Sequence, residues 1–218
     1  MAKFDISKYK NVHVLNHPLI QHKISLLRDK NTNTSDFRRI VQEIAQLEGY
    51  EALRDLKTTK VKVSTPIEET LTPIISKNDL CFVPILRAGL GMVDGMLDLL
   101  PGTKVGHIGL YRDEETHKPH FYYYKAPKDL PKRHVIIVDP MLATGGSAID
   151  AVKLLKEKGA KNISLICIIS APEGVKAFCD EYPDIDLYTG VIDRCLNKNA
   201  FICPGLGDAG DRIFGTVE

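Results

Sequence analysis

The chain has 218 residues, and its 29 Lys and Arg against 28 Asp and Glu leave a formal net charge of +1. This length fits one sizeable domain, residues 1–218, and leaves little room for a second one. The balanced charge argues against a broad nucleic-acid-binding surface, which needs clustered basic residues. No run of 18 apolar residues predicts a membrane span, and the polar N-terminus is unlike a signal peptide. We therefore expect a cytoplasmic protein without nucleic-acid or membrane partners.

The five cysteines and seven histidines form no pattern typical of a disulfide framework or a zinc site. The cysteine number is odd, there is no C-x-x-C, and Cys81 and Cys167 lie inside apolar runs. These features indicate reduced, buried thiols, as expected in the cytosol. The histidines show no H-E-x-x-H spacing, so we expect no zinc site.

The N-terminal segment 1–60 is predicted to be mainly helical. Apolar residues at helical spacing predict a helix over residues 16–30, with Asn16 as its N-cap. A second, longer helix follows, for which Thr34 or Ser35 is the expected N-cap. Amphipathic helices of this kind usually pack on their own core, so the segment carries no catalytic signal.

A short edge strand and a further helix are predicted next. Lys60–Val63 alternates basic and apolar residues, as an exposed strand does. Thr65-Pro66, followed by Glu68-Glu69, is typical of a helix N-terminus, because proline is favoured in the first helical turn.

From residue 80 onward, apolar strands alternate with helices. This alternation predicts an α/β fold with a central parallel sheet and helices on both faces. The predicted strands cover residues 80–86, 105–111, 135–138, 163–169, 187–192 and 201–203, and the helices begin near residues 92, 147 and 172.

A segment rich in charged and aromatic residues interrupts the alternation at 113–131. Prolines bound it, and Phe121–Tyr124 has the composition of one strand of a projecting hairpin. We expect this β-hairpin arm to contact another subunit.

Residues 134–159 combine the features of an anion site. The apolar run Val135–Val138 ends on Asp139, and a short loop leads through Thr144-Gly145-Gly146-Ser147 into an amphipathic helix with Gly159 at its C-cap. N–H groups at the start of a helix lack intrahelical partners, and glycines let a phosphate approach them closely. This stretch therefore predicts a phosphate-bearing ligand.

Two further predicted strands end on arginines, Arg87 and Arg112. Alone, each would be assigned to a surface salt bridge. Ligands of an open α/β sheet bind at the carboxyl ends of its strands, however, and Asp139 ends a third strand. Arginine suits phosphate because its planar fork donates two parallel hydrogen bonds. Together these strand ends predict a substrate with several phosphates.

A second glycine-rich stretch lies near the C-terminus, where Gly205–Gly210 matches G-x-G-x-x-G. The dinucleotide-binding fingerprint must open a helix inside a βαβ unit, and no such unit follows here. The stretch 134–159 likewise lacks the lysine of a Walker A loop. A glycine-dense loop exposes backbone donors and acceptors, so we expect residues 200–212 to bind a small planar ligand.

Four segments together resemble the uracil phosphoribosyltransferases, a family of type I phosphoribosyltransferases. They are Asp139–Ser147, Ile85–Met92, Gly109–Asp113 and Pro204–Arg212, in the family's order and spacing across nearly the whole chain. The first is similar to the superfamily's loop for phosphoribosyl diphosphate (PRPP), and the last narrows the resemblance to uracil. The resemblance implies the type I phosphoribosyltransferase fold and the reaction of uracil with PRPP to give UMP and diphosphate, a pyrimidine salvage step.

The resemblance also implies how the substrates bind. The 5′-phosphate would lie on the N–H groups of Ala143–Ser147, and Asp139 would hold the ribose hydroxyls. Arg87 and Arg112 would bind the diphosphate together with Mg²⁺. Catalysis would come from stabilising the departing diphosphate and aligning the base, with Asp208 facing PRPP.

Three groups of site residues follow from this resemblance. The expected catalytic residues are Arg87, Arg112, Asp139 and Asp208. The expected PRPP-binding residues are Arg87, Arg112, Asp139, Pro140, Met141, Leu142, Ala143, Thr144, Gly145, Gly146, Ser147 and Asp208. The expected uracil-binding residues are Ile202, Gly207, Asp208 and Ala209.

The chain also departs from the wider superfamily. Asp139-Pro140 replaces the two adjacent acids that many type I phosphoribosyltransferases have, so we expect no metal site from the protein alone and Mg²⁺ that arrives with PRPP. Phe201 stands where the family often has tyrosine. The resemblance suggests an unusual backbone, such as a cis peptide, in the Arg87-Ala88 turn. It also implies a homodimer or higher homo-oligomer, and GTP is an effector of some members.

Two other functions stay open. One is a regulator with the same fold that binds PRPP or UMP and RNA, against which the near-neutral charge speaks. The other is a phosphoribosyltransferase for another pyrimidine base, such as orotate. The carboxylate of orotate would want a cation, whereas Gly205–Gly210 contains an acid and no basic residue. Arg212 lies just beyond and could supply that cation.

Overall fold

The computed structural model describes residues 4–75, 79–112 and 119–216. Its main sheet contains β1 (Val12–Val14), β4 (Leu80–Leu86), β5 (Lys104–Val105), β6 (His107–Arg112), β7 (Pro119–Lys125), β8 (His134–Val138), β9 (Met141–Leu142), β10 (Asn162–Ser170) and β11 (Asp186–Ile192). The strand order is β1-β11-β10-β8-β4-β6-β7, with β5 beside β4 and β9 beside β10. These neighbours run parallel, except that β7 is antiparallel to β6.

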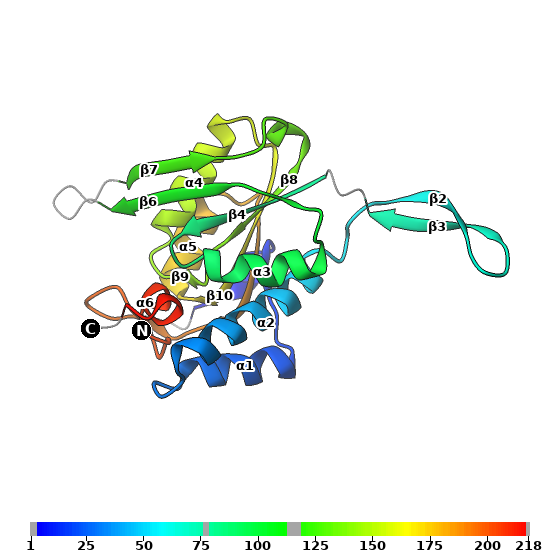
Figure 1. Ribbon diagram of the computed structural model, residues 1–218. Coiled ribbons are helices and arrows are strands. Elements are labelled where there is room, and N and C mark those ends of the chain that lie inside the picture. Colours follow the sequence, from blue (N-terminus) through cyan, green and yellow to red (C-terminus); the bar gives the residue numbers. More distant parts are fainter. Residues whose placement is uncertain (1–3, 76–78, 113–118, 217–218) are drawn as a thin grey trace.

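Helices cover both faces of this sheet (Figure 1). Four helices contribute to the core on one face: α1 (Pro18–Arg28), α2 (Thr34–Ala52), α3 (Leu90–Leu99) and α6 (Ala209–Phe214). The other face packs against α4 (Gly146–Glu157) and α5 (Pro172–Glu181). In β8, Ile136 and Val138 belong to the first core and Val135 and Ile137 to the second, because successive side chains of a strand point to opposite faces. The predicted fold, a parallel sheet with helices on both faces, is confirmed.

The two predicted N-terminal helices are present, but each begins at a different cap. The ring of His17, rather than Asn16, accepts the first free N–H of α1. Asn33 caps α2, one residue before the predicted Thr34. Both observed caps supply a side-chain acceptor, which is what the first turn of a helix requires. The segment 1–60 also holds β1, a strand that the periodicity did not predict.

The helix predicted from Thr65-Pro66 is wrong, because β2 (Thr58–Ser64) and β3 (Glu69–Ile75) form an antiparallel hairpin there. The Thr65 hydroxyl accepts the N–H groups two and three residues on, as an N-cap side chain does, but it also donates to the Glu68 carbonyl and closes the hairpin turn. The edge strand predicted at Lys60–Val63 is confirmed as part of β2.

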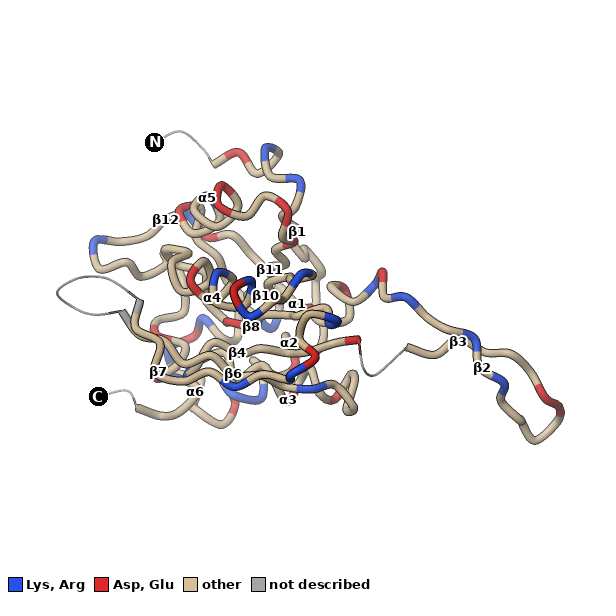
Figure 2. Tube along the Cα trace, turned by 90° about the horizontal axis from the view of Figure 1, so that it is seen from above, with Lys and Arg blue, Asp and Glu red and all other residues tan. Residues whose placement is uncertain are grey.

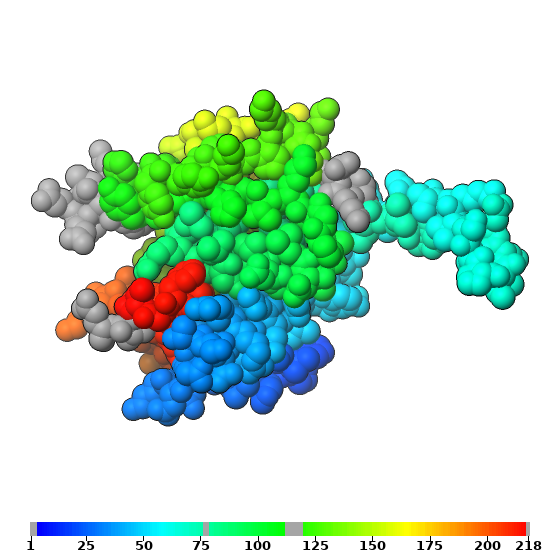
Figure 3. All heavy atoms as spheres, in the orientation of Figure 1, coloured from blue at the N-terminus to red at the C-terminus, as the bar shows by residue number. Residues whose placement is uncertain are grey.

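The β2–β3 hairpin projects from the body of the molecule (Figures 1 and 3). The strand predicted at Phe121–Tyr124 is confirmed as part of β7, the edge strand beside β6. The tip of the predicted arm 113–131, residues 113–118, lies outside the described residues. Among the described residues, 58–75 form a second hairpin, which the sequence did not predict.

The C-terminal region contains two elements beyond the predicted last strand. β12 (Cys195–Leu196) pairs with β13 (Ile202–Cys203), and the predicted loop 200–212 runs into α6. Asp208 caps α6 by accepting the N–H of Asp211. Two 3-10 turns, Ile6–Lys8 and Leu130–Lys132, complete the helical elements of the described residues.

Charges of both signs are interspersed along the described chain (Figure 2). Among the helices of the described residues, none is long and apolar enough to span a membrane.

Candidate active site

Three predicted strand ends lie at the same edge of the sheet. β4 pairs in parallel with both β6 and β8, so their carboxyl ends meet there. Arg87 follows β4, Arg112 is the last residue of β6, and Asp139 follows β8. For Arg112 the structure describes only the position in the strand.

The loop after Asp139 is tied to the neighbouring strand β10. Pro140 is buried, and its carbonyl oxygen accepts two N–H groups of β10. Met141 and Leu142 form β9, which adds to the same strand. The loop is therefore held by backbone hydrogen bonds before it reaches Ala143.

Gly145 lets this loop enter α4. Its φ of +85° lies in the left-handed region, and a Cβ there would be 2.9 Å from the carbonyl oxygen of Gly174 in α5. Another residue would be strained and would press on that backbone. Gly146 and Ser147 begin α4, and exposed Thr144 lies just before them, so free N–H groups and the positive end of the helix dipole face this loop.

A small pocket of about 80 Å³ lies inside the loop. Its lining combines the helix N–H groups that favour a phosphate with one carboxylate, that of Asp139. Most of the residues predicted to bind PRPP after β8 are brought together around it. Its lining is Asp139, Met141, Leu142, Ala143, Thr144, Gly145, Ser147, Ala148 and Cys167.

Asp139 is half-buried in this pocket, and its Oδ1 accepts the N–H of Met141 at 3.3 Å. Burial raises the pKa of Asp139 to about 7, against which the Met141 N–H acts, and the negative charge of Asp208 raises it further. A hydroxyl donor or a cation beside the carboxylate would favour its charged form.

Arg87 reaches from the end of β4 to the glycine-rich loop. Its Nη2 donates to Asp211 Oδ1 at 3.1 Å, and the Asp211 N–H donates to Asp208 Oδ1 at 2.9 Å. A Cβ on Gly210 would lie 3.8 Å from Arg87 Nη2 and 3.2 Å from Asp208 Oδ1. Because the Arg87 side chain is 57% exposed, it can turn to an anion without breaking a buried contact.

The residues predicted to bind a base share one loop. Ile202 and Ala209 are buried at its two ends, and Gly207 and Asp208 are exposed between them. The backbone groups of this exposed turn are therefore open to a ligand. The loop meets the turn after β4, because a Cβ on Gly210 would lie 3.8 Å from Ala88 Cβ. Gly89 of the same turn lies against the Val138 carbonyl oxygen, one residue before Asp139.

The guanidinium of Arg212 is held by backbone carbonyl groups on the other side of this loop. Its Nη1 donates to the carbonyl oxygens of Leu27 at 2.5 Å and Leu206 at 2.9 Å, and its Nη2 donates to that of Asp29 at 2.6 Å. The guanidinium lies 4.3 Å from the centre of the Phe37 ring. With these partners it is a fixed support of the loop rather than a free cation for a ligand.

Two residues beneath the loop escaped prediction. Asp193 follows β11, and its carboxylate accepts two hydrogen bonds from Arg28 at the end of α1. The signal that singled out Arg87 could have found Asp193, because it too is a charged residue directly after an apolar strand. Arg28 gave no signal, since a basic residue in the last turn of a helix is common.

The turn after β4 has the unusual backbone that the resemblance suggested. A cis peptide joins Leu86 to Arg87, one bond before the Arg87-Ala88 turn, and another joins Cys203 to Pro204. Phe201, which stands at a position where tyrosine is frequent in the family, has a ring that is 46% exposed. It therefore lies at the surface beside the loop and not in the core.

Comparison with known proteins places the chain in a family. Residues 14–216 match the family described as UPRTase, uracil phosphoribosyltransferase. The uracil phosphoribosyltransferase of Streptococcus suis (strain 05ZYH33) is 59% identical over 203 residues, which are 93% of this chain and 97% of that protein. The solved structure of the AQ2163 protein from Aquifex aeolicus has a TM-score of 0.89 at 36% identity and covers 93% of this chain and 97% of its own.

The fold extends beyond that family. A hypoxanthine-guanine phosphoribosyltransferase from Bacillus anthracis reaches a TM-score of 0.50 at 13% identity, covering 73% of this chain and 80% of its own, which shows a shared fold. The parallel sheet with helices on both faces is thus the fold of a type I phosphoribosyltransferase. With the family match over nearly its whole length, this chain belongs to the uracil phosphoribosyltransferase family.

Proposed function

We propose that this protein transfers the 5-phosphoribosyl group of PRPP to uracil, giving UMP and diphosphate, and so salvages a free pyrimidine base. One observation carries the proposal beyond family membership: two loops face one site at the carboxyl edge of the sheet. The turn after β4 joins them. Arg87 donates to Asp211 in the helix that follows Asp208, and Gly89 of the same turn lies against the Val138 carbonyl oxygen, one residue before Asp139. A transfer between ribose and base requires such side-by-side sites.

PRPP would bind along the loop after β8. The N–H groups of Ala143–Ser147 at the start of α4 suit its 5′-phosphate, since a helix N-terminus favours negative charge. Asp139 would accept hydrogen bonds from the ribose hydroxyls. Arg87 and Arg112 follow neighbouring strands and would bind the diphosphate.

Uracil would be read by the glycine-rich loop. One edge of uracil presents an acceptor, a donor and an acceptor. The backbone groups of Ile202, Gly207 and Ala209 can answer with N–H, C=O and N–H, and Asp208 would face the ribose. Such a site recognises the hydrogen-bonding edge of the base and rejects bases that lack it.

The contacts of Arg212 favour a neutral base over orotate. Its guanidinium already donates to the carbonyl oxygens of Leu27, Leu206 and Asp29 and lies over Phe37. A carboxylate on the base would therefore meet Asp208 without a free cation from Arg212. Burying such an unpaired charge is costly.

The reaction forms the bond between N1 of uracil and the anomeric carbon as the bond from that carbon to diphosphate breaks. Positive charge develops on the ribose, as in glycoside chemistry. Asp139 and Asp208 would stabilise that charge, and Arg87 and Arg112 would stabilise the departing diphosphate. N1 loses its proton as the bond forms, and an oxygen of the departing diphosphate can accept it. We assign catalysis to alignment and electrostatics, with no covalent protein intermediate.

The site fits Mg²⁺ that arrives with PRPP. A cation beside Asp139 would favour the carboxylate form of this side chain, and Mg²⁺ prefers such oxygen ligands. In the part of the chain that the structure describes, no group of three His, Cys, Asp or Glu side chains is arranged to hold a metal ion. When bound, Mg²⁺ would neutralise charge on the diphosphate.

A single assay tests the proposed reaction. Purified protein with PRPP, Mg²⁺ and uracil should produce UMP and diphosphate in equal amounts, and no diphosphate when uracil is omitted. Addition of GTP to the same assay tests whether GTP is an effector, as in some family members. Diphosphate release that does not depend on uracil, or the absence of UMP, would contradict the proposal.

We further propose a homo-oligomer in the cytoplasm. The β2–β3 hairpin carries Ile67, which is 91% exposed, and Leu71, which is 66% exposed. Apolar side chains on a projecting hairpin are typical of a contact surface, and a second copy of the chain is the partner that the family resemblance supports. All five cysteines are free thiols, as expected in a reducing compartment.

A further inference from the structure

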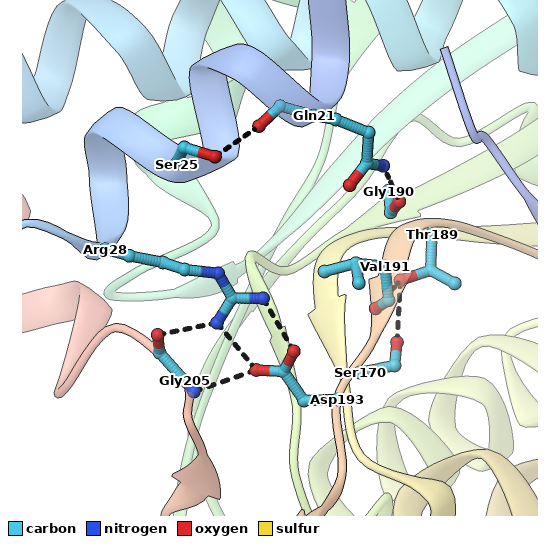
Figure 4. A network of polar contacts seen from close by, with 9 residues as sticks. All are labelled: Gln21, Ser25, Arg28, Ser170, Thr189, Gly190, Val191, Asp193 and Gly205. Atoms are coloured by element: carbon cyan, nitrogen blue, oxygen red, sulfur yellow. Dashed lines mark hydrogen bonds and ion pairs between the residues drawn. The ribbon is translucent and has the colours of Figure 1, made fainter. Parts of the chain in front are cut away.

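A largely buried ion pair lies beneath the glycine-rich loop, between α1 and the end of β11 (Figure 4). Arg28 Nη1 and Nη2 donate to the two carboxylate oxygens of Asp193 at 2.8 and 2.6 Å. The Asp193 side chain is 4% exposed and the Arg28 side chain 25%. This two-pronged geometry fixes both side chains relative to one another.

The same two side chains hold the backbone of Gly205 (Figure 4). Arg28 Nη1 donates to the Gly205 carbonyl oxygen at 2.8 Å, and the Gly205 N–H donates to Asp193 Oδ2 at 2.8 Å. The chain turns sharply at Gly205, whose φ is +61°. The turn requires glycine, because a Cβ would lie 2.1 Å from the Ile202 carbonyl oxygen. Gly207 and Asp208 follow directly, so the position of Gly205 sets the direction of the exposed part of the loop.

Asp193 is itself fixed to the strand that supports the phosphate loop. Its N–H donates to the carbonyl oxygen of Ser170 at the end of β10, at 2.8 Å. Ser170 is the register partner of Leu142 in β9, and the next N–H, that of Ala171, donates to the Leu142 carbonyl oxygen at 2.9 Å. The Ser170 and Thr189 hydroxyls are 2.9 Å apart and join β10 to β11. Both loops of the site are therefore anchored to the end of β10.

Stability alone gives little reason for this ion pair. Removing two charges from water costs about as much as their attraction returns, and apolar residues of similar volume are often as stable. What an apolar pair could not supply is the fixed donor and acceptor for Gly205. The pair is thus better explained by the position it imposes on the loop than by the energy it adds.

We propose that Arg28 and Asp193 are positioning residues, which set the distance between the base-binding loop and the phosphoribosyl-binding loop and so align uracil with the anomeric carbon. This inference rests on the proposed function, which assigns uracil to the glycine-rich loop. Neither residue is assigned a contact with the reacting atoms, and both act through Gly205. Misplacing a reacting group by about 1 Å can cost on the order of 100-fold in rate.

The test compares four single variants and one double variant in steady-state kinetics, with each substrate varied in turn. Arg28→Gln and Asp193→Asn remove the charge pair, and Arg28→Lys keeps the charge without the fork that reaches Gly205. The matched control is Lys23→Gln, on the same helix, whose ammonium pairs with Glu43 at 2.6 Å and whose side chain is 19% exposed. PRPP binding without uracil is measured by calorimetry, and folding by the melting temperature.

A positioning role predicts a split between the two substrates. Arg28→Gln and Asp193→Asn should raise KM for uracil and lower kcat, each about tenfold or more, while the Kd for PRPP alone stays unchanged. Arg28→Lys should recover part of the loss, and Lys23→Gln should behave as the parent at temperatures well below melting. The double variant Arg28→Gln/Asp193→Asn should have about the same kcat and uracil KM as the less active of the two single variants, because the two residues act as one unit.

Two outcomes would overturn the positioning role. One is an equal loss of uracil and PRPP binding that follows the drop in melting temperature, which is the result of general destabilisation. The other is unchanged KM for uracil and unchanged kcat in both single variants. Failure of the proposed function looks different, because the parent protein itself would then form no UMP from uracil and PRPP.

Discussion

At the scale of single residues, Asp139 combines partial burial with a proposed role, binding the ribose hydroxyls, that requires charge. Burial raises its pKa to about 7, with Asp208 adding to the rise. A neutral carboxyl group accepts weaker hydrogen bonds from ribose hydroxyls than a carboxylate does. The free protein should therefore bind PRPP less well when Asp139 is protonated.

This argument predicts the pH dependence of PRPP use. As pH rises through about 7, Asp139 loses its proton, and kcat/KM for PRPP should increase and then level off. Asp139→Asn has no such group and should lose the step near pH 7 together with most of its activity. The phosphate of PRPP itself titrates near pH 6, which affects both proteins equally. The ratio of kcat/KM for PRPP between the parent and Asp139→Asn therefore isolates the contribution of Asp139. A ratio that is constant from pH 5.5 to 8.5 would exclude Asp139 as the titrating group.

In the proposed site, Asp208 would lie where the glycine-rich loop meets the ribose. Asp208→Ala removes the carboxylate facing PRPP and the N-cap of α6, whereas Asp208→Asn keeps a capping side chain. Both variants should lose on the order of 100-fold in kcat if the charge stabilises the transition state. Circular dichroism and the melting temperature check that Asp208→Asn is folded. Near-normal turnover by the asparagine variant would remove Asp208 from the catalytic group.

At the scale of elements, the contact between α2 and β11 contains a carboxyl group without a role in the site. Glu48 of α2 is completely buried, and its Oε1 would lie 2.8 Å from a Cβ on Gly190 of β11. Burial raises the pKa of Glu48 well above its ordinary value. Folding therefore favours the protonated form.

The sign of the resulting stability effect follows from linkage. The contribution of Glu48 is fully present below its unfolded pKa of about 4.3 and falls by up to about 1.4 kcal/mol for each pH unit above it, until the folded pKa is reached. Glu48→Gln has no proton to lose, so its melting temperature should exceed that of the parent increasingly from pH 5 to pH 8.

Glu43 on the same helix serves as the opposite control. Its hydrogen bond with Lys23 lowers its pKa, so its contribution is present above the unfolded pKa, and Glu43→Gln should lower the melting temperature at pH 8. A melting difference for Glu48→Gln that does not change with pH would show that the buried carboxyl group does not titrate as argued.

The sequence predicted an element correctly where its local pattern is typical of only one structure. The strand ends at Arg87 and Asp139 could be predicted because buried parallel strands are short apolar runs that stop at a charged residue. The sequence could not decide between a helix and a hairpin at Thr65. A threonine hydroxyl that accepts the N–H groups two and three residues on can cap a helix, but here it closes a hairpin turn. The glycine-rich loop was expected to continue to residue 212, but α6 begins after its N-cap, Asp208. The helix was not predicted because glycines on either side of Asp208 favour a loop. The ion pair of Arg28 with Asp193 joins residues 165 positions apart, which no local pattern encodes.

At the scale of the whole molecule, the projecting β2–β3 hairpin is hard to explain in an isolated chain. A two-stranded hairpin on its own is at best marginally stable in water, and this one exposes Ile67 and Leu71. A second copy of the chain would cover these side chains and stabilise the hairpin. The catalytic edge of the sheet is formed by other segments.

Charged substitutions on the hairpin test this assembly. Ile67→Lys/Leu71→Lys should shift the protein toward monomer in sedimentation velocity, because a lysine cannot be buried in the contact without cost. Thr70→Lys adds the same charge at an exposed polar position of the same strand and should leave the assembly intact. An unchanged sedimentation coefficient for the double variant would place the subunit contact elsewhere.

Base specificity tests the central claim most directly, because it depends on both loops at once. The measurement is kcat/KM for uracil, orotate and hypoxanthine with saturating Mg²⁺ and PRPP, followed by identification of each nucleotide product. We predict that uracil exceeds both other bases by on the order of 1,000-fold or more, since a hydrogen-bonding site discriminates strongly against a base with the wrong edge. Comparable turnover of orotate or hypoxanthine would contradict the assignment of the glycine-rich loop to uracil.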